Sequence, residues 1–594
     1  MIAIRAASVA ALLGIMVVQP GPFPLTAMRY SATGVVRKGL SLRAARLKTT
    51  THDARGGIQS AESGGTPRFH AKAGTSAASV QQFDVRVFGA KGDGHTIDSD
   101  AINRAIDAAA AAGGGTVYLG AGIYASYSIH LKSHVGLYLD QGAVLLAADT
   151  AGGKGYDPAE PGPGNNFQDF GHSRFHNSLI WGENVEDVSI TGRGRIDGTA
   201  LSRGLNATAA DLDTRPGQAN KAIAFKRARH VLLRDFSILR GGHMAILATG
   251  VDDLMIDNLV IDTARDGIDV DVCRNVRIAN VTVNAPNDDA IVLKSSFALG
   301  AALPTENVTI TNSSVSGFDV GTVLSGTYGR TLTAAPDRDG PTGRIKLGTE
   351  SNGAFRNITI SNIVFQRSRG LALETVDGAS LEDITVSNIT MREVSNAPFF
   401  LRLASRMRGP ANTLVGKLRR VTISNVNVYD ADPRYASIVA GVPGHPVEDV
   451  RFSNIRILYR GGLSLTQAAS QPPEMVNAFF RPPGGTGPRE AYAVPEREAM
   501  YPEPSLFGVL PAYGFYIRHA AGIQMDGISV GFMSDDTRPA FVLDDVRDIE
   551  LHGIRAQKSG DVPTFLLRDV EEFRLMHSVV GPDRYIKKVG RESF

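Results

Sequence analysis

The chain has 594 residues, of which 43% are hydrophobic and 21% charged, so it is long and apolar enough to bury a large core. Its formal net charge is only +2, and the first 80 residues hold 10 basic but only 2 acidic side chains, which leaves the remainder acidic. These values exclude a basic nucleic-acid-binding body, and the single cysteine, Cys273, excludes an intrachain disulfide.

The N-terminus has the pattern of a targeting segment. Arg5 precedes an apolar run over residues 6–18, which is typical of a secretory signal and too short to span a bilayer. We expect a signal peptide over residues 1–27, with Met28 as an alternative translation start, followed by a basic flexible leader over residues 28–80. The sequence therefore predicts a secreted or periplasmic protein that contacts no membrane beyond this signal segment.

One short helix is predicted near the start of the body. Residues 98–115, DSDAINRAIDAAAAAGGG, combine helix-favouring alanines with three glycines that end the helix. Strand-like runs at 116–119 and 135–139 flank this segment. The helix is expected to cover the N-terminal opening of the strand-rich body that follows.

A strand motif with a central asparagine recurs along the body, as in LMIDNLVI and VRIANVTV. A period near 22 to 30 residues with insertions indicates a solenoid, and the β-branched, period-two runs favour strands over helices. Stacked asparagine amides are expected to bond at one corner of each coil. We predict an all-β fold, a right-handed parallel β-helix with the short helix as its N-terminal cap; the repeated asparagines are Asn258, Asn280, Asn312, Asn362, Asn388, Asn425 and Asn454.

The same strand pattern continues to the C-terminus. We therefore expect a single β-helix domain over residues 81–594, interrupted by a Pro-rich loop at about 467–511 that lies on one face.

Three carboxylates follow the coil period. Asp266 lies 23 residues after His243, and Asp288 lies 22 residues after Asp266, so successive coils should bring them together with Asp289. Crowded carboxylates repel, so at least one should keep a proton near neutral pH, and the group can supply both a general acid and a general base. A calcium site and a solvated acidic turn are the alternatives for the same residues.

Four motifs in order resemble glycoside hydrolase family 28, the polygalacturonase and rhamnogalacturonan hydrolase family; they are VFGAKGDGHTIDSDAINRAI, SLIWGENVEDVSITGRGRIDG, DGIDVDVCRNV and DDAIVLKS. The resemblance runs from about Phe83 to Gly461. It implies a parallel β-helix that hydrolyses galacturonate-containing pectin backbones with inversion and without metal or cofactor. By motif, Asp288 would be the general acid, while Asp266 and Asp289 would activate water.

The sequence departs from the polygalacturonase pattern at three places. Ala264 and Arg265 replace an Asn-Thr pair, the Gly-His-Gly motif is missing, and a cationic pair that grips galacturonate has become Ala372 and Glu374. Since Glu374 would repel a carboxylate, we expect a rhamnogalacturonan-type substrate, with homogalacturonan as the alternative.

Several side chains are candidates for binding the sugar. His243 is either a replacement for the missing histidine or a structural residue. The cations Arg265, Lys294, Arg344, Lys346 and Arg402 could bind galacturonate or could be ordinary solvated side chains.

The expected partner is a plant cell-wall pectic polysaccharide or oligosaccharide bound by a monomer. A β-helix polysaccharide lyase and a non-catalytic carbohydrate-binding solenoid are the rival interpretations. The sequence leaves open whether the enzyme attacks inside a polymer or at its end.

Overall fold

The structure is a computed structural model that describes residues 81–150, 155–161, 167, 172–202, 217–477, 479 and 487–594. The predicted signal peptide over 1–27 and leader over 28–80 lie outside the described residues. Within the described ranges, no helix is long and apolar enough to cross a membrane.

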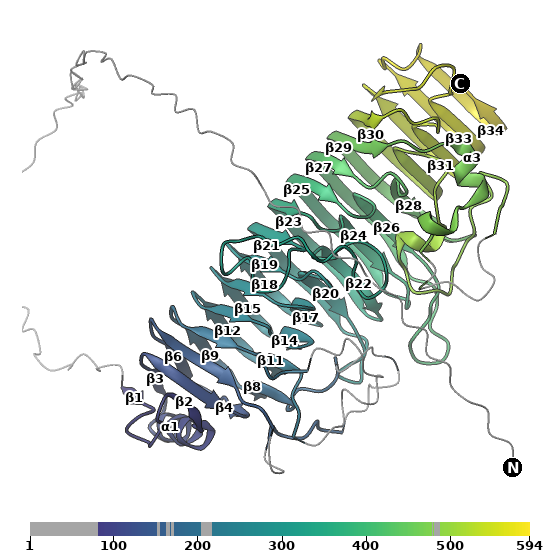
Figure 1. The fold of residues 1–594 in the computed structure, drawn as a ribbon. Helices are drawn as coiled ribbons and strands as arrows, with labels where there is room; N and C mark the ends of the chain where they lie inside the picture. Colours follow the sequence, from purple (N-terminus) through teal and green to yellow (C-terminus); the bar gives the residue numbers. More distant parts are fainter. Residues whose placement is uncertain are drawn as a thin grey trace, which may run out of the picture. The chain divides into compact units, whose positions relative to one another are not determined.

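The body is a right-handed parallel β-helix, as predicted, and its strands form three sheet faces (Figure 1). The first face, which we call sheet A, pairs each strand with its counterpart one coil later. Its strands are β1 (Gln82–Asp84), β3 (Gly115–Leu119), β6 (Val135–Leu139), β9 (Glu186–Thr191), β12 (Arg229–Arg234), β15 (Asp252–Asp257), β18 (Arg274–Ala279), β21 (Pro304–Ser316), β23 (Ala354–Gln366), β25 (Ser380–Val394), β27 (Lys417–Ala431), β29 (Val447–Gly461), β30 (Phe515–Ser534), β31 (Phe541–His552), β33 (Phe565–Met576) and β34 (Arg584–Ser593).

The second face, sheet B, continues from sheet A around a corner, and from β21 onward the same long strands serve both faces. Its separate strands are β2 (Asp93–Ile97), β4 (Gly122–Ser126), β7 (Ala143–Ala147), β10 (Arg195–Asp197), β13 (Ser237–Leu239), β16 (Val260–Asp262), β19 (Thr282–Asn284) and β32 (Arg555–Ala556).

The third face, sheet C, carries the site described below. Its strands are β5 (Ile129–His130), β8 (Ser178–Glu183), β11 (Lys221–Lys226), β14 (Met244–Thr249), β17 (Asp266–Asp271), β20 (Ile291–Ser295), β22 (Ile345–Ser351), β24 (Leu371–Thr375), β26 (Phe399–Leu403) and β28 (Ser437–Ala440). The coils continue in β30, which pairs with β28.

The asparagine corner between sheets A and B forms as the repeat predicted. Asn388 has a φ of 58°, a left-handed conformation that asparagine tolerates better than most side chains. Its amide donates to the Oδ1 of Asn362 at 3.0 Å and its own Oδ1 accepts from Asn425 at 3.2 Å. Asn454 extends the ladder to Asn425 at 2.9 Å. The ladder of asparagine side chains runs from Asn312 to Asn454, whereas Asn258 and Asn280 bond to the aspartates Asp235 and Asp257.

Both ends of the described stack are covered. Helix α1 (Ser99–Ala111) packs its buried face, which includes Ile102 and Ile106, against the first coil. At the other end β34 pairs with β33, and this pairing is antiparallel, unlike the parallel ladders before it. The apolar interior runs between these ends as one continuous cluster.

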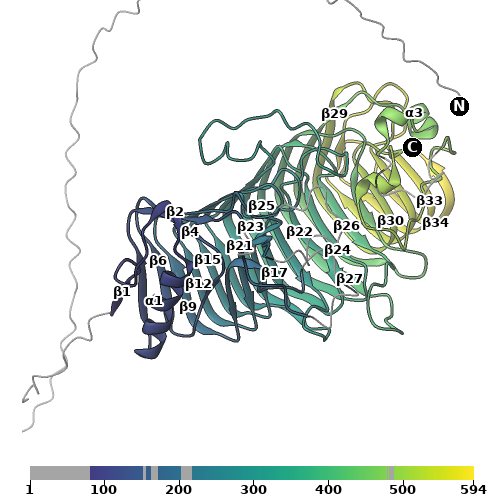
Figure 2. The ribbon, with the colours of Figure 1, turned by 60° about the horizontal axis from the view of Figure 1, so that its bottom comes forward.

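The Pro-rich insertion follows β29 and lies against the outer side of sheet C (Figure 2). Its described part includes α3 (Leu465–Ser470) and the 3-10 helices η2 (Pro473–Met475) and η3 (Pro504–Phe507). Phe507 and Leu510 pack with Phe400, Ile438 and other apolar side chains of sheet C. The insertion therefore covers strands that would otherwise face solvent.

Candidate active site

The three predicted aspartates lie together on sheet C. Asp266 begins β17, and Asp288 and Asp289 occupy the turn that leads into β20, the next strand of the sheet. The backbone N–H of Asp289 donates to Asp266 Oδ1 at 3.2 Å. One carboxylate oxygen from each residue lies within 4.8 Å of the other two. The coil spacing predicted this juxtaposition.

These carboxylates open into a cavity of about 540 Å³. Its walls come from sheet C, from loops between the coils and from the Pro-rich insertion. The residues that line it are His172, His243, Arg265, Asp266, Asn287, Asp288, Asp289, Lys294, Pro336, Asp337, Thr342, Arg344, Lys346, Glu350, Arg369, Arg408, Phe479, Tyr501 and Glu503.

The three carboxylates have different electrostatic surroundings. Burial raises the pKa of Asp266 well above its usual range, and the neighbouring Asp288, Asp269 and Asp289 add to this rise. Burial also opposes ionisation of Asp289, but Lys346 and Arg344 outweigh it and hold the pKa of Asp289 below its usual range. The surroundings therefore favour the protonated form of Asp266 and the ionised form of the neighbouring Asp289.

Asp288 is the most exposed of the three and forms an ion pair with Arg265. Asp289 bonds to Arg344 Nε at 2.7 Å and lies 3.2 Å from Lys346 Nζ. The oxygen separations within 4.8 Å are shorter than the roughly 6.5 to 9.5 Å common between the two carboxyl groups of inverting glycosidases. The spacing alone thus gives no support for inversion.

Five of the predicted binding residues line the cavity: His243, Arg265, Lys294, Arg344 and Lys346. They are not ordinary solvated side chains, because each is buried or half-buried. Lys294 bonds to Glu350 at 2.8 Å. Burial and the charge of Arg265 keep the pKa of His243 well below its usual range, so this imidazole is neutral.

Two predicted residues do not line the cavity. Glu374 is fully buried behind Lys346, whose Nζ lies 3.9 Å away, and burial raises the pKa of Glu374 to about 7. Arg402 donates to the backbone carbonyls of Gly441 at 2.9 Å and Glu496 at 2.8 Å. Both belong to strands that the insertion covers, which the alternation of strand residues could not reveal.

Several residues of the cavity wall were not predicted from the sequence. Tyr501 and Glu503 come from the Pro-rich insertion, whose residues follow no coil period. Asp337 comes from the loop between β21 and β22, and Arg369 lies just before β24. Of these residues, only Arg369 could have been found from the sequence, because it directly precedes a strand of the coil repeat.

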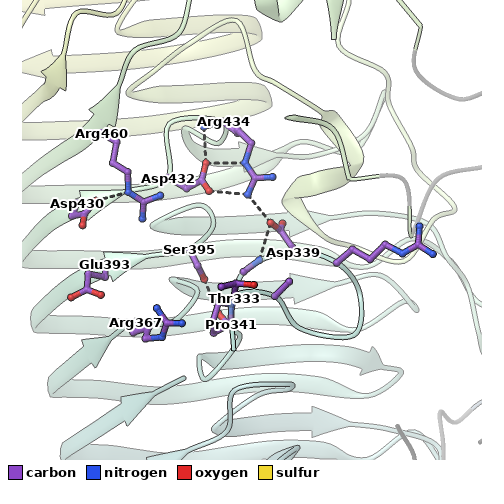
Figure 3. Close-up of a pocket in the computed structure, with 13 residues that line it drawn as sticks. Thr333, Asp339, Pro341, Arg367, Glu393, Ser395, Asp430, Asp432, Arg434 and Arg460 are labelled. Carbon is purple, nitrogen blue, oxygen red and sulfur yellow. Dashed lines mark hydrogen bonds and ion pairs between the residues drawn. The ribbon is translucent and has the colours of Figure 1, made fainter. Parts of the chain in front are cut away.

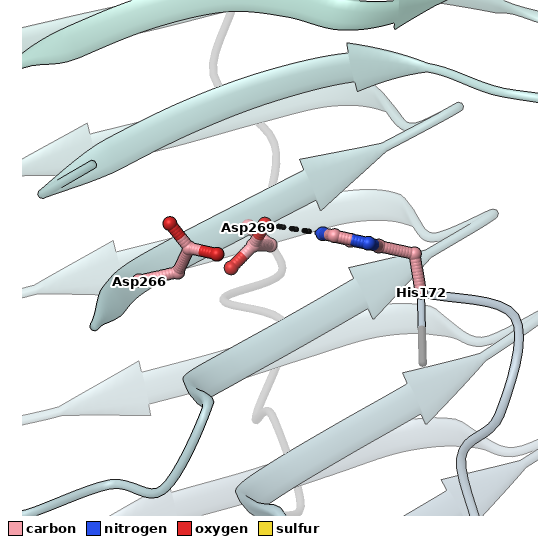
Figure 4. A group of neighbouring side chains, drawn as sticks. All are labelled: His172, Asp266 and Asp269. Atoms are coloured by element: carbon pink, nitrogen blue, oxygen red, sulfur yellow. Dashed lines mark ion pairs between the residues drawn. The ribbon is translucent and has the colours of Figure 1, made fainter. Parts of the chain in front are cut away.

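A histidine from a distant loop approaches the same group (Figure 4). His172 Nε2 lies 3.4 Å from Asp269 Oδ1, and both side chains are buried beside Asp266. Among the described residues, two groups have the geometry to share a cation: His172 with Asp266 and Asp269, and the three site aspartates. The first group could hold a divalent metal ion by nitrogen and oxygen ligands, and the second by oxygen ligands alone.

A second charged pocket, of about 470 Å³, has none of these three carboxylates among its lining residues (Figure 3). Its ion pairs join neighbouring coils and one loop, since Arg434 contacts both Asp432 at 2.8 Å and Asp339 at 2.7 Å, while Arg460 contacts Asp430 at 2.5 Å. No group of three carboxylates comparable to the site appears among the described residues that line it.

Comparison with known proteins links the fold to the site. Residues 82–169 match the profile "Rhamnogalacturonase A/epimerase, pectate lyase-like", and residues 164–328, which hold the three aspartates, match "Glycosyl hydrolases family 28". A probable polygalacturonase of Vitis vinifera is 25% identical over 389 residues, covering 62% of this chain and 73% of that protein. An exo-poly-alpha-D-galacturonosidase of Dickeya chrysanthemi is 28% identical over 231 residues, 37% of this chain and 35% of that protein.

Among solved structures, the family 28 exopolygalacturonase of Yersinia enterocolitica has a TM-score of 0.54 at 16% identity, covering 82% of this chain and 79% of that chain. At this identity the likeness shows a shared fold. The part of the chain that holds the three aspartates is therefore similar to glycoside hydrolase family 28, and the body has the parallel β-helix fold of the solved exopolygalacturonase.

Proposed function

We propose that this protein hydrolyses glycosidic bonds in the galacturonate-containing backbone of a pectic polysaccharide or oligosaccharide. One observation carries the proposal: a cavity of about 540 Å³ holds three clustered carboxyl groups, and their surroundings raise the pKa of Asp266 and lower that of Asp289. A general acid and a general base are what glycoside hydrolysis requires. The named activities of the relatives in Vitis and Dickeya favour the same substrate class.

The ionised Asp289 is suited to accept a proton from an attacking water, because Arg344 and Lys346 stabilise its charge. The general acid has two candidates. The family motif assigns this role to Asp288, which would protonate the glycosidic oxygen, whereas the raised pKa favours Asp266 as the residue that carries the proton. Arg265, paired with Asp288, would have to shift before Asp288 could act as the acid.

Leaving-group dependence separates the two candidates. Asp266→Asn and Asp288→Asn should each be compared on a natural oligosaccharide and on an aryl glycoside of the same sugar. Loss of the general acid should reduce turnover of the natural substrate at least about 100-fold, with much of the rate recovered on the aryl glycoside, which needs no protonation. Normal turnover of the natural substrate by both folded variants would contradict the proposed site. The anomer formed first, followed by NMR, tests inversion.

We further propose a rhamnogalacturonan-type backbone in preference to homogalacturonan. The support is electrostatic: Arg265, Lys294, Arg344, Lys346 and Arg369 of the cavity wall are each already paired with at least one carboxylate of the protein. A substrate carboxylate would have to compete for them. Digestion of both polymers and of short oligomers, with product length and linkage measured, tests this preference and distinguishes attack at chain ends from internal attack.

We also propose that the protein acts as a monomer exported to the periplasm or the exterior, where it would meet the polymer directly. A lyase would be recognised in the same digestions by its unsaturated products.

A further inference from the structure

The Pro-rich insertion places a carboxylate inside the cavity. Glu503 is 2% exposed and lies at the start of η3, where the following Phe507 is anchored against Phe400 of sheet C. The insertion is therefore held in place by apolar packing, and Glu503 is a fixed part of the cavity wall.

Glu503 binds two guanidinium groups from different coils. Arg344 Nη2 donates to Glu503 Oε1 at 2.5 Å and Nη1 to Oε2 at 3.3 Å, a two-pronged contact. Arg369 Nη1 lies 3.3 Å from Glu503 Oε1. Two arginines that hold the Glu503 carboxylate in this way could bind the carboxylate of a uronic acid in the same manner.

The charges at this wall are already balanced. Besides Glu503, Arg344 contacts Asp289 at 2.7 Å and Arg369 contacts Asp337 at 2.7 Å. Lys346 adds one positive charge nearby, but it contacts Asp289 and the buried Glu374. An incoming carboxylate would thus find no surplus positive charge and would lie close to Glu503 in a poorly solvated place, where repulsion between like charges is strong.

We propose that Glu503 is a specificity-determining residue: it occupies the Arg344–Arg369 pair as a built-in carboxylate and makes this wall select an uncharged sugar over a uronate. The inference rests on the proposed function for the class of ligand, and it identifies the anion that sets the preference as Glu503, which lines the cavity, in place of Glu374, which does not. Because Arg344 also bonds to Asp289, the sugar selected would lie next to the reacting bond.

The test measures binding as well as hydrolysis. Glu503→Gln keeps the side chain's size and removes its charge, so that Arg344 and Arg369 lose the carboxylate they share and keep only Asp289 and Asp337. Calorimetric titration would compare digalacturonate with its uncharged dimethyl ester. We expect wild type to bind the ester at least as tightly as the acid. Glu503→Gln should bind the acid about tenfold more tightly than wild type does and leave the affinity for the ester within about twofold.

Two controls keep the result interpretable. Glu474→Gln makes the same change at an exposed position of the same insertion and should alter neither affinity. Thermal unfolding reports whether Glu503→Gln is folded. The wild-type comparison is decisive even without the variant, because wild type that binds the acid tenfold more tightly than the ester overturns the inference.

A folded Glu503→Gln protein with an unchanged acid-to-ester ratio also overturns it. If wild type hydrolyses no pectic backbone but the ratio shifts as expected, the proposed function fails while the role of Glu503 stands.

Discussion

The asparagine corner and sheet C are two sides of the same coils with different roles. At the corner between sheets A and B, exposed asparagines such as Asn388 repeat one hydrogen bond from coil to coil. On sheet C, side chains from successive coils bring buried charges of both signs together, as Asp266, Asp289 and Lys346 do. The corner is regular because successive coils make the same turn there, whereas the cavity combines acidic and basic side chains from different coils. Residues that follow the coil period therefore stabilise the fold at the corner and bring charged groups together on sheet C.

The largest difference between the two sides should appear when a charge is removed from the cavity. Asp289→Asn should lower kcat at least about 100-fold, because the ionised carboxylate suited to accept the proton of water is lost. Asp430→Asn is the matched control, since it removes a carboxylate from an ion pair with Arg460 in the second pocket. It should leave kcat within about twofold; equal losses in the two variants, measured on one oligosaccharide, would contradict the assignment.

The buried carboxyl beneath the cavity should make stability depend on pH. The pKa of Glu374 is raised to about 7, so the folded protein keeps a proton that the unfolded chain releases above its ordinary value of 4.5. The contribution to stability is present below about pH 4.5 and is lost as pH rises toward 7. Relative to Glu374→Gln, wild type should lose on the order of 3 kcal/mol of unfolding free energy between pH 4.5 and 8.

Urea denaturation of both proteins across this pH range provides the measurement. A difference between wild type and Glu374→Gln that stays constant with pH would mean that Glu374 is ionised in the folded state.

A change at the asparagine corner should affect stability and leave catalysis alone. Asn388→Ala removes two side-chain hydrogen bonds and places alanine at a φ of 58°, which together should cost about 1–2 kcal/mol. Asn388→Gly loses the same bonds without the backbone strain and should cost less. Unfolding free energies rank the variants, and a kcat that falls in step with stability would show that the two sides are coupled.

The smallest expected effect concerns metal. Two groups of site residues have the geometry to share a cation, but the proposed chemistry uses carboxylates alone. Exhaustive treatment with EDTA should leave turnover within experimental error. Loss of activity that calcium restores would instead favour a metal-dependent site at Asp266 and its neighbours.

The sequence was most informative where residues follow the coil period. The asparagine repeat predicted the parallel β-helix and its corner, and the 22-residue step from Asp266 to Asp288 predicted their proximity, because one period in a solenoid is one strand spacing in space. The α1 cap was equally readable, since alanines followed by glycines define a short helix without reference to the rest of the fold.

The rest of the site depends on contacts between residues whose spacing in the sequence does not follow the coil period. Glu503 reaches Arg344 across 159 positions of sequence, through an insertion whose path its own residues do not specify. Glu374 was predicted to face the sugar from its place in the family motif, and Arg402 from the alternation of its strand. Their burial behind Lys346 and beneath the insertion depends on what packs over them. The alternation of residues along a strand indicates the face on which a side chain lies, but it does not indicate which segment covers that face.

The reversed last strand has a consequence for how the molecule meets its own copies. Each parallel coil presents backbone donors and acceptors on which one more coil could grow, so an uncovered final coil would be a template for head-to-tail fibres. β34 runs antiparallel to β33, so the parallel register stops at β33 among the described residues, and β34 carries Arg584, Lys587, Lys588 and Arg591. Like charges on an edge strand repel a second copy. β34 therefore hinders a second copy from adding a parallel coil at this edge.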